Sequence, residues 1–202
     1  KNHDVAVTSM ALLAFLGAGN STRFGKYKTN VQKAVYWLKD KQKANGCIGP
    51  HRYEAGIALM ASAEAFGMSG GADLKQFAQK AVNWAAESQC VTGGWDYGPH
   101  IDETKGHRVD TSVTGWWVMG IKSAKTAGLN VPYEVIEKAL KYIQRVTTEP
   151  KNDKGYGGTC TVNYGGHAKN PMTLADVPRG GGSTRLTAVG LTSLQFLGRP
   201  RT

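Results

Sequence analysis

Four charged residues occupy corresponding positions at the starts of apolar helical segments. Aligning these segments with one another places Asp4, Glu54, Asp110 and Arg185 each at, or just before, a predicted helix start. If these starts face one end of the fold, the four side chains ring one cavity mouth. Carboxylates there could exchange protons with a ligand, and Arg185 could pair with an acidic neighbour or an anionic ligand. Helix capping is the competing role for the acids, because Asp is a favoured N-cap and a carboxylate there meets the helix dipole.

Histidines and aromatic residues are abundant around the same helix starts and in the loops that precede them. Their ring faces could stabilise carbocations or stack on sugars in a cavity. Packing between helices is the competing role for the tryptophans. The residues that we predict to surround a ligand, besides the four charged ones, are His51, Arg52, Tyr53, Trp95, Tyr97, His100, His107, Trp116, Trp117, Tyr156, Tyr164 and His167.

A metal site is one alternative for some of these residues. His100, His107, Asp110 and His167 could be drawn together as ligands, but no characteristic spacing fixes their geometry. The three cysteines form no CxxC pair, which argues against a closed zinc knuckle. We therefore predict no metal and no cofactor.

The elements that must position these residues recur along the chain. Lys33–Trp37 is echoed by Lys80–Trp84 and by Lys138–Tyr142, at intervals of 47 and 58 residues. Each copy has apolar residues on one helical face, which predicts an amphipathic outer helix. Other segments are apolar nearly all round and are expected to be inner helices, covered on every side. These segments are Val5–Leu16, Tyr53–Phe66, Thr111–Ala127 and Thr187–Leu197.

A glycine-containing loop follows each outer helix. Gln42–Ile48 and Gln89–Trp95 share a glutamine, a glycine four residues later and an apolar residue two further on. The third loop, Lys154–Gly158, keeps the glycines and an aromatic residue. Glycine permits the positive φ of a tight turn, and the apolar residue can fill the space between adjacent helical hairpins.

This loop resembles a known repeat. Gln89-x3-Gly93-x-Trp95 matches the Q-x3-G-x-W repeat of the squalene and oxidosqualene cyclases, whereas the other copies have Ile48 for Trp and Thr147 for Gln. With the helix pattern, the resemblance covers nearly the whole chain. It implies an all-α (α/α) toroid of about seven helices in a single domain, residues 1–202, like that of the cyclases and protein prenyltransferases. The resemblance implies five to seven hairpins for a complete toroid, whereas seven helices make about three and a half. We therefore expect an open ring, a longer chain, or closure by self-association.

The motifs of the best-known relatives are missing. The cyclases use an Asp-x-Asp-Asp acid, of which Asp110-Thr111-Ser112 is the nearest fragment. The same segment resembles the Asp-x-Cys zinc ligands of the prenyltransferases, but Ser112 replaces the Cys, and Arg185 lies where the His ligand is expected. The Cys-Gly-Glu-Gln run of complement-like thioester domains is absent. Asp110 remains the one candidate catalytic residue.

Composition limits the partners. The formal net charge of +10 suggests an anionic partner, and lysines cluster around the first predicted outer helix, although a solvated basic face explains them as well. No nucleic-acid motif accompanies them. The apolar stretches are interrupted well before the roughly 20 residues of a membrane span. The glycine-rich segment Thr161–Gly182 is predicted to be a lid or binding loop, with a disordered insertion as the alternative.

The leading expectation is a toroid that binds an apolar or anionic-apolar ligand, by analogy an isoprenoid, without established catalysis. The alternative is a non-catalytic binding or scaffold module of a larger protein, which recognises a glycan or peptide at the barrel mouth. A glycan-degrading enzyme is third, and would need two of Asp4, Glu54 and Asp110 to lie roughly 5–10 Å apart.

Overall fold

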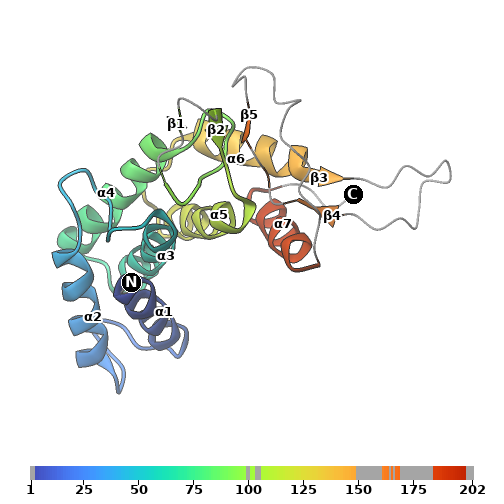
Figure 1. The fold of residues 1–202 in the computed structure, drawn as a ribbon. Helices are drawn as coiled ribbons and strands as arrows, with labels where there is room; N and C mark the ends of the chain where they lie inside the picture. Colours follow the sequence, from blue (N-terminus) through green and yellow to red (C-terminus); the bar gives the residue numbers. More distant parts are fainter. Residues whose placement is uncertain are drawn as a thin grey trace. The chain divides into compact units, whose positions relative to one another are not determined.

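Seven helices carry most of the secondary structure in the computed structural model, which describes residues 3–98, 101–102, 106–148, 161–163, 165, 167–168 and 184–198 (Figure 1). The predicted all-α class is confirmed, and five strands of two or three residues are added. The helices are α1 (Asp4–Gly17), α2 (Lys28–Asp40), α3 (Arg52–Ser69), α4 (Ala72–Ser88), α5 (Thr111–Thr126), α6 (Tyr133–Val146) and α7 (Thr184–Phe196). The strands are β1 (Ile101–Asp102), β2 (Gly106–Arg108), β3 (Thr147–Thr148), β4 (Thr161–Val162) and β5 (His167–Ala168).

The helices form where the apolar periodicity predicts them. α2, α4 and α6 coincide with the predicted outer helices and bury one face each. α3 is buried along most of its length, as expected of a helix that is apolar all round. α1 differs, because only Val5, Ser9, Leu12 and Leu16 of its residues are buried.

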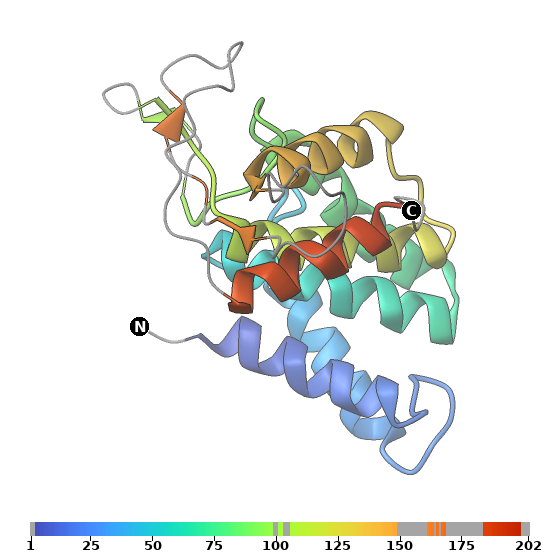
Figure 2. The ribbon, with the colours of Figure 1, turned by 90° about the vertical axis from the view of Figure 1, so that its right-hand side faces the viewer.

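The chain divides into two compact units. Unit 1 comprises Lys1–Ser88 and Met119–Pro132, and unit 2 comprises Gln89–Val118 and Tyr133–Thr202, so α5 contributes to both. In unit 1, α1 packs against α2 and α3, and α3 packs against α4 (Figure 2). Gly120 lets α5 approach α3 closely, because an added Cβ would lie 2.9 Å from Leu59.

Unit 2 is built around α6. Its core cluster joins α6 to the segment between α4 and α5, to β4 and to α7. β1, β2 and β5 form an antiparallel sheet in the order β1-β2-β5, and β3 pairs with β4. The described residues of the predicted loop Thr161–Gly182 are the paired strands β4 and β5 together with Asn163 and Gly165, and its other residues lie outside the described ranges. The core cluster consists of Cys90, Val109, Tyr142, Ile143, Val146, Val162 and Leu186.

The shared spacing of the two glutamine loops corresponds to one repeated hydrogen-bond pattern, which we call the glutamine bridge. Gln42 Nε2 donates to the carbonyl oxygens of Gly46 (3.2 Å) and of Phe77 on α4 (3.0 Å). Gln89 Nε2 donates to the carbonyl oxygens of Gly93 and of Val135 on α6, both at 2.9 Å. Each amide thus closes its own loop and binds it to the next outer helix.

The glycine of each loop lies directly against that next helix. A Cβ added to Gly46 would lie 2.1 Å from the Lys80 carbonyl oxygen, and one added to Gly93 would lie 2.0 Å from that of Lys138. Both glycines also have positive φ, +92° and +99°. The motif therefore requires glycine for two reasons, backbone conformation and close approach.

Replacing Gln89 with alanine is expected to lower the free energy of unfolding by about 1–3 kcal/mol, because the hydrogen bonds of its amide to the Gly93 and Val135 carbonyl oxygens are both lost. Chemical denaturation measures this change. Gln144→Ala is the matched control, because Gln144 is exposed on α6 and its loss should change stability by less than about 0.5 kcal/mol. Equal effects of the two substitutions would contradict a structural role for the bridge.

Candidate functional site

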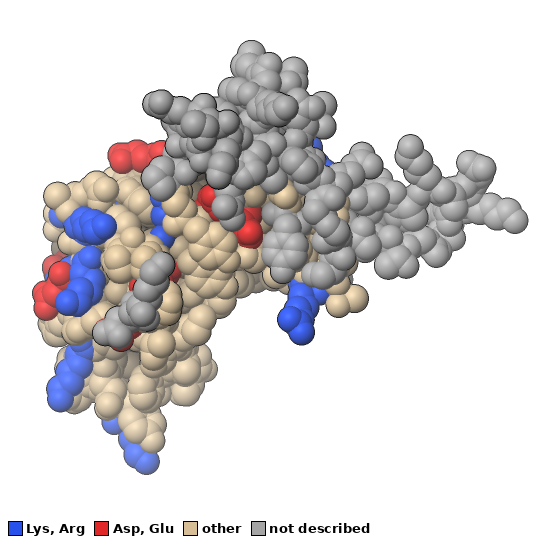
Figure 3. Space-filling view, viewed as in Figure 1, with Lys and Arg blue, Asp and Glu red and all other residues tan. Residues whose placement is uncertain are grey.

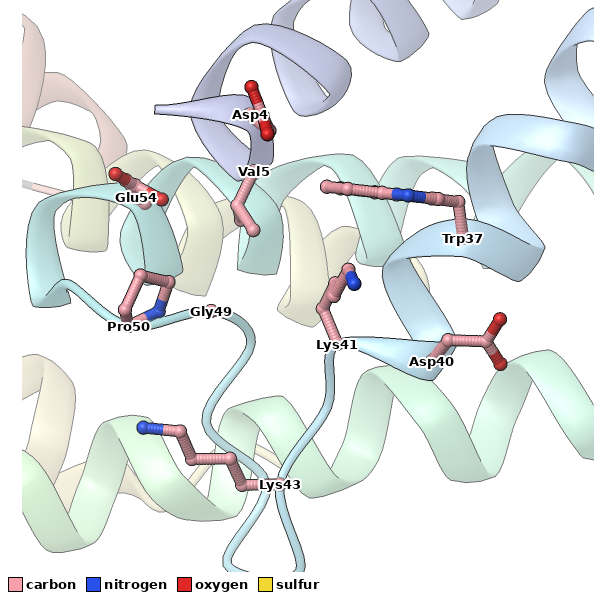
Figure 4. A pocket seen from close by; sticks show the side chains of 9 residues that line it. All are labelled: Asp4, Val5, Trp37, Asp40, Lys41, Lys43, Gly49, Pro50 and Glu54. Carbon is pink, nitrogen blue, oxygen red and sulfur yellow. The ribbon is translucent and has the colours of Figure 1, made fainter. Parts of the chain in front are cut away.

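A pocket of about 410 Å³ lies in unit 1, where the start of α1, the end of α2 and the start of α3 come together (Figure 4). It contains Asp4 and Glu54, two of the four charged residues predicted to ring a cavity mouth. The starts of α1 and α3 thus lie at one pocket, while a ligand-binding role for Asp4 and Glu54 stays a prediction. The residues that line the pocket are Asp4, Val5, Trp37, Asp40, Lys41, Lys43, Gly49, Pro50 and Glu54.

Glu54 is the most unusual residue of the pocket. Its side chain is only 2% exposed, although an ionisable carboxyl group is costly to bury without partners. Oε1 lies 2.7 Å from Nδ1 of His3, whose ring is mostly exposed. Oε2 is buried and has no hydrogen-bond partner among the described residues. Glu54 thus brings to the wall of the pocket a carboxyl group with one acceptor oxygen that has no partner among the described residues.

The end of α2 supplies an aromatic ring and two ammonium groups. Trp37 is half-buried, and Lys41 Nζ lies 5.1 Å from the centroid of its ring, a cation–π distance. Figure 4 shows the indole of Trp37 and the side chain of Lys41 reaching toward Val5, while Asp40 points the other way. The lining residues include three carboxylates and two ammonium groups, but most of the pocket surface is apolar.

The loop between α2 and α3 forms one wall of the pocket. Gly49 has a φ of +87°, and a Cβ added there would lie 2.8 Å from Cγ2 of Val5. The loop can therefore lie against the first turn of α1 only with glycine at this position. Pro50, four residues before Glu54, then leads the chain into α3.

Asp110 belongs to unit 2, where it caps α5. Its Oδ1 accepts hydrogen bonds from Ser112 N (2.7 Å), Val113 N (3.3 Å) and Ser112 Oγ (2.6 Å). This is the N-cap arrangement that competed with a catalytic role in the sequence. Tyr97, also predicted to bind ligand, lies nearby, with its hydroxyl 3.5 Å from Ser112 Oγ. A catalytic role for Asp110 remains a prediction.

Trp95 and Trp117 lie in the core of unit 2. Both are fully buried, and their rings stack 5.6 Å apart at 13°. The main chain of Trp95 is fixed as well, because its N–H donates to Thr114 Oγ1 (3.0 Å) and its carbonyl accepts from Asp110 N (3.0 Å). These two residues, predicted to surround a ligand, therefore fill the repeat interior and offer no surface to one.

The other predicted residues are distributed over both units. His51 lies beside His3, with ring centroids 5.8 Å apart, and Tyr53 is half-buried on α3. Trp116 is half-buried on α5 and Arg185 is exposed on α7. His107 and His167 lie on neighbouring strands, since β2 pairs with β5, while His100, Tyr156 and Tyr164 lie outside the described residues.

Two buried groups in the loops and core have perturbed protonation. Burial raises the pKa of the Cys47 thiol, and the charges of Lys43 and Arg52 oppose this only in part. Burial likewise raises the pKa of Tyr142, whose hydroxyl lies 2.9 Å from Thr111 Oγ1. Cys47 and Cys90 are both buried free thiols. The Cys47 thiol and the Tyr142 hydroxyl therefore stay neutral near pH 7, because burial raises the pKa of each.

Four further findings concern metal ligands, membrane spans, surface charge and similarity to known proteins. No three His, Cys, Asp or Glu residues in the described part of the chain are placed to hold a metal ion. Among the same residues, no helix has the length and hydropathy needed to cross a membrane. On the face drawn in Figure 3, the described lysine and arginine side chains appear as separate groups. A scan against protein-family models and a search of curated proteins find no match to the chain.

Sequence reasoning missed the residues that give the pocket its character. His3, Trp37 and Asp40 were not among the candidates, and Lys41 and Lys43 counted only as part of a lysine cluster. The sequence signal for Trp37 is its position in the repeat, where it is equivalent to Trp84. Trp84, at the corresponding position of α4, is buried, whereas Trp37 remains partly open beside a charged loop.

Proposed function

We propose that this chain is a non-catalytic binding module of the (α/α) toroid type, and that the pocket at Glu54 holds part of a glycan or another polyhydroxylated ligand. The observation that carries the proposal is the buried Oε2 of Glu54 without a hydrogen-bond partner among the described residues. This oxygen is a hydrogen-bond acceptor, so a ligand that satisfies it has to bring a donor. Sugar hydroxyl groups are such donors.

The rest of the pocket fits the same ligand class. Asp4 adds a second carboxylate, and Lys41 and Lys43 add ammonium donors for ligand oxygens. The indole of Trp37 offers an apolar ring beside these polar groups, the combination on which sugar rings stack. A volume of about 410 Å³ falls within the range of small-ligand sites.

An anionic-apolar, isoprenoid-like ligand is the second candidate. Lys41 and Lys43 favour it, because they lie near Val5 and Trp37 and could bind a diphosphate group beside an apolar chain. Against it, a diphosphate would enter a pocket with three carboxylates and would bring no donor to Glu54. Charge and hydrogen bonding therefore favour the polyhydroxylated ligand.

Binding of soluble oligosaccharides, measured by isothermal titration calorimetry, tests the proposal with farnesyl diphosphate as the competing probe. We expect saturable binding of an oligosaccharide and an at least tenfold weaker affinity in Glu54→Gln. The substitution removes the carboxylate charge, which strengthens hydrogen bonds from ligand hydroxyl groups.

Glu64→Gln is the matched control for this variant. Glu64 lies on the same helix, accepts a hydrogen bond from Ser123 Oγ (2.6 Å) and does not line the pocket. The affinity of the Glu64→Gln variant for the oligosaccharide should equal that of the unmodified chain. Binding of farnesyl diphosphate alone, or unchanged affinity in Glu54→Gln, would refute the proposal.

A further inference from the structure

The outer helices α4 and α6 bury the same face, which contacts the preceding loop. On α4, this face receives the loop of Gln42 and Gly46, and on α6 it receives the loop of Gln89 and Gly93. All eight positions of the two faces are buried. They are Phe77, Ala81, Trp84 and Ser88 on α4, and Val135, Ala139, Tyr142 and Val146 on α6.

The corresponding face of α2 is open. The repeat interval of 47 residues places Asn30, Ala34, Trp37 and Lys41 at the equivalent positions. Asn30 and Lys41 are exposed, and Ala34 and Trp37 are only half-buried. In the described part of the chain, no glutamine donates to the Asn30 carbonyl as Gln42 and Gln89 do to those of Phe77 and Val135.

The helix paired with α2 is open in the same way. Val7 of α1 is 66% exposed, whereas Ile57 and Val113, its equivalents on α3 and α5, are fully buried. Met10 is 44% exposed, and Ala11 and Ala14 on the same helical face are exposed too. A contiguous apolar helix face open to water usually marks an interaction surface.

We propose that α1 and α2 form a docking surface for one further helical hairpin of the same repeat type. Its outer helix would end in a Gln-x3-Gly loop, with the glutamine amide donating to the Asn30 carbonyl and the glycine lying against the Lys33 carbonyl. Both contacts repeat those observed twice within the chain. Repeat proteins bury their hydrophobic faces through such nearest-neighbour contacts.

The occupant is a hairpin from outside these 202 residues, not a second copy of the chain. Gln42 and Gln89 already bridge to α4 and α6, and Thr147 replaces the glutamine of the third loop. A second copy could therefore offer its loops only by breaking its own bridges. This inference is independent of the proposed ligand, although Trp37 and Lys41 belong to both surfaces and docking would narrow access to the pocket.

A fusion protein tests the docking surface. A second copy of residues 50–98, which holds α3, α4 and the Gln89 loop, is placed before Lys1 of the full chain. Relative to the unfused chain, we expect at least tenfold slower hydrogen–deuterium exchange in α1 and α2. We also expect at least twofold weaker acrylamide quenching of the Trp37 fluorescence. The Trp37 signal is obtained as the difference between the protein and its Trp37→Phe variant.

The matched control is the same fusion with Gln89→Ala and Gly93→Val in the added copy only, so that the original chain is unchanged. This fusion should exchange as fast as the unfused chain. Equal protection in both fusions, or protection in neither, would overturn the proposal. So would sedimentation of the unfused chain as a dimer that Val7→Glu dissociates, because the occupant would then be a second copy.

Discussion

Gly93→Ala is expected to lower the free energy of unfolding of unit 2 by roughly 3–5 kcal/mol, which is enough to unfold a marginally stable domain. Two costs add. A residue with a Cβ is strained at a φ of +99°, and the new methyl group would lie 2.0 Å from the Lys138 carbonyl oxygen. That oxygen belongs to the backbone of α6, so no side-chain rotation can relieve the contact.

Urea denaturation followed by circular dichroism measures this loss. Gly98→Ala is the matched control, because Gly98 lies five residues further on, has no positive φ, and has no atom within 4 Å of an added Cβ. Its stability should change by less than about 0.5 kcal/mol. If Gly93→Ala changed the free energy of unfolding as little as Gly98→Ala, this result would contradict the close approach of the loop to α6.

Trp95→Ala is expected to lower the free energy of unfolding by about 3–5 kcal/mol, because it removes a fully buried indole and the stacking of that indole on Trp117. The backbone of residue 95 stays bonded to Thr114 and Asp110, so the loop has little freedom to collapse into the cavity. Most of the lost volume should remain empty, and the cost should lie at the upper end of this range.

The repeat supplies a graded comparison for this variant. Ile48 occupies the equivalent position in the first loop and is also buried, so Trp95→Ile should cost about half as much as Trp95→Ala. Tyr97→Ala, two residues away and 49% exposed, should change thermal stability little. A Trp95→Ala protein as stable as Tyr97→Ala would show that the indole does not hold unit 2 together.

The helices and the loop motif could be predicted because their causes are local. Apolar spacing determined where α2, α4 and α6 form, and the offset between Gln42 and Gln89 identified the two equivalent loops. The N-cap role of Asp110 was also foreseeable, since an acid directly before an apolar helix is a common cap.

The pocket could not be predicted, because it depends on contacts between distant segments. His3 meets Glu54 across 51 positions, and helical periodicity carries no information about such pairs. The open face of α1 was missed for a related reason. Its all-round apolar composition predicts burial, but burial also requires a neighbouring hairpin, and the described residues provide none for Val7.

The glutamine bridge gives the repeat array a direction. Each loop depends on the outer helix that follows it, since Gln42 reaches Phe77 on α4 and Gln89 reaches Val135 on α6, while the following helix does not depend on that loop for its own backbone hydrogen bonds. Loss of the following hairpin would leave the glutamine amide without its second acceptor, whereas loss of the preceding loop would leave the backbone hydrogen bonds of the following helix in place. The array therefore has a structural polarity that a symmetric stack of helices would lack, although the interface energy is shared equally by the two hairpins.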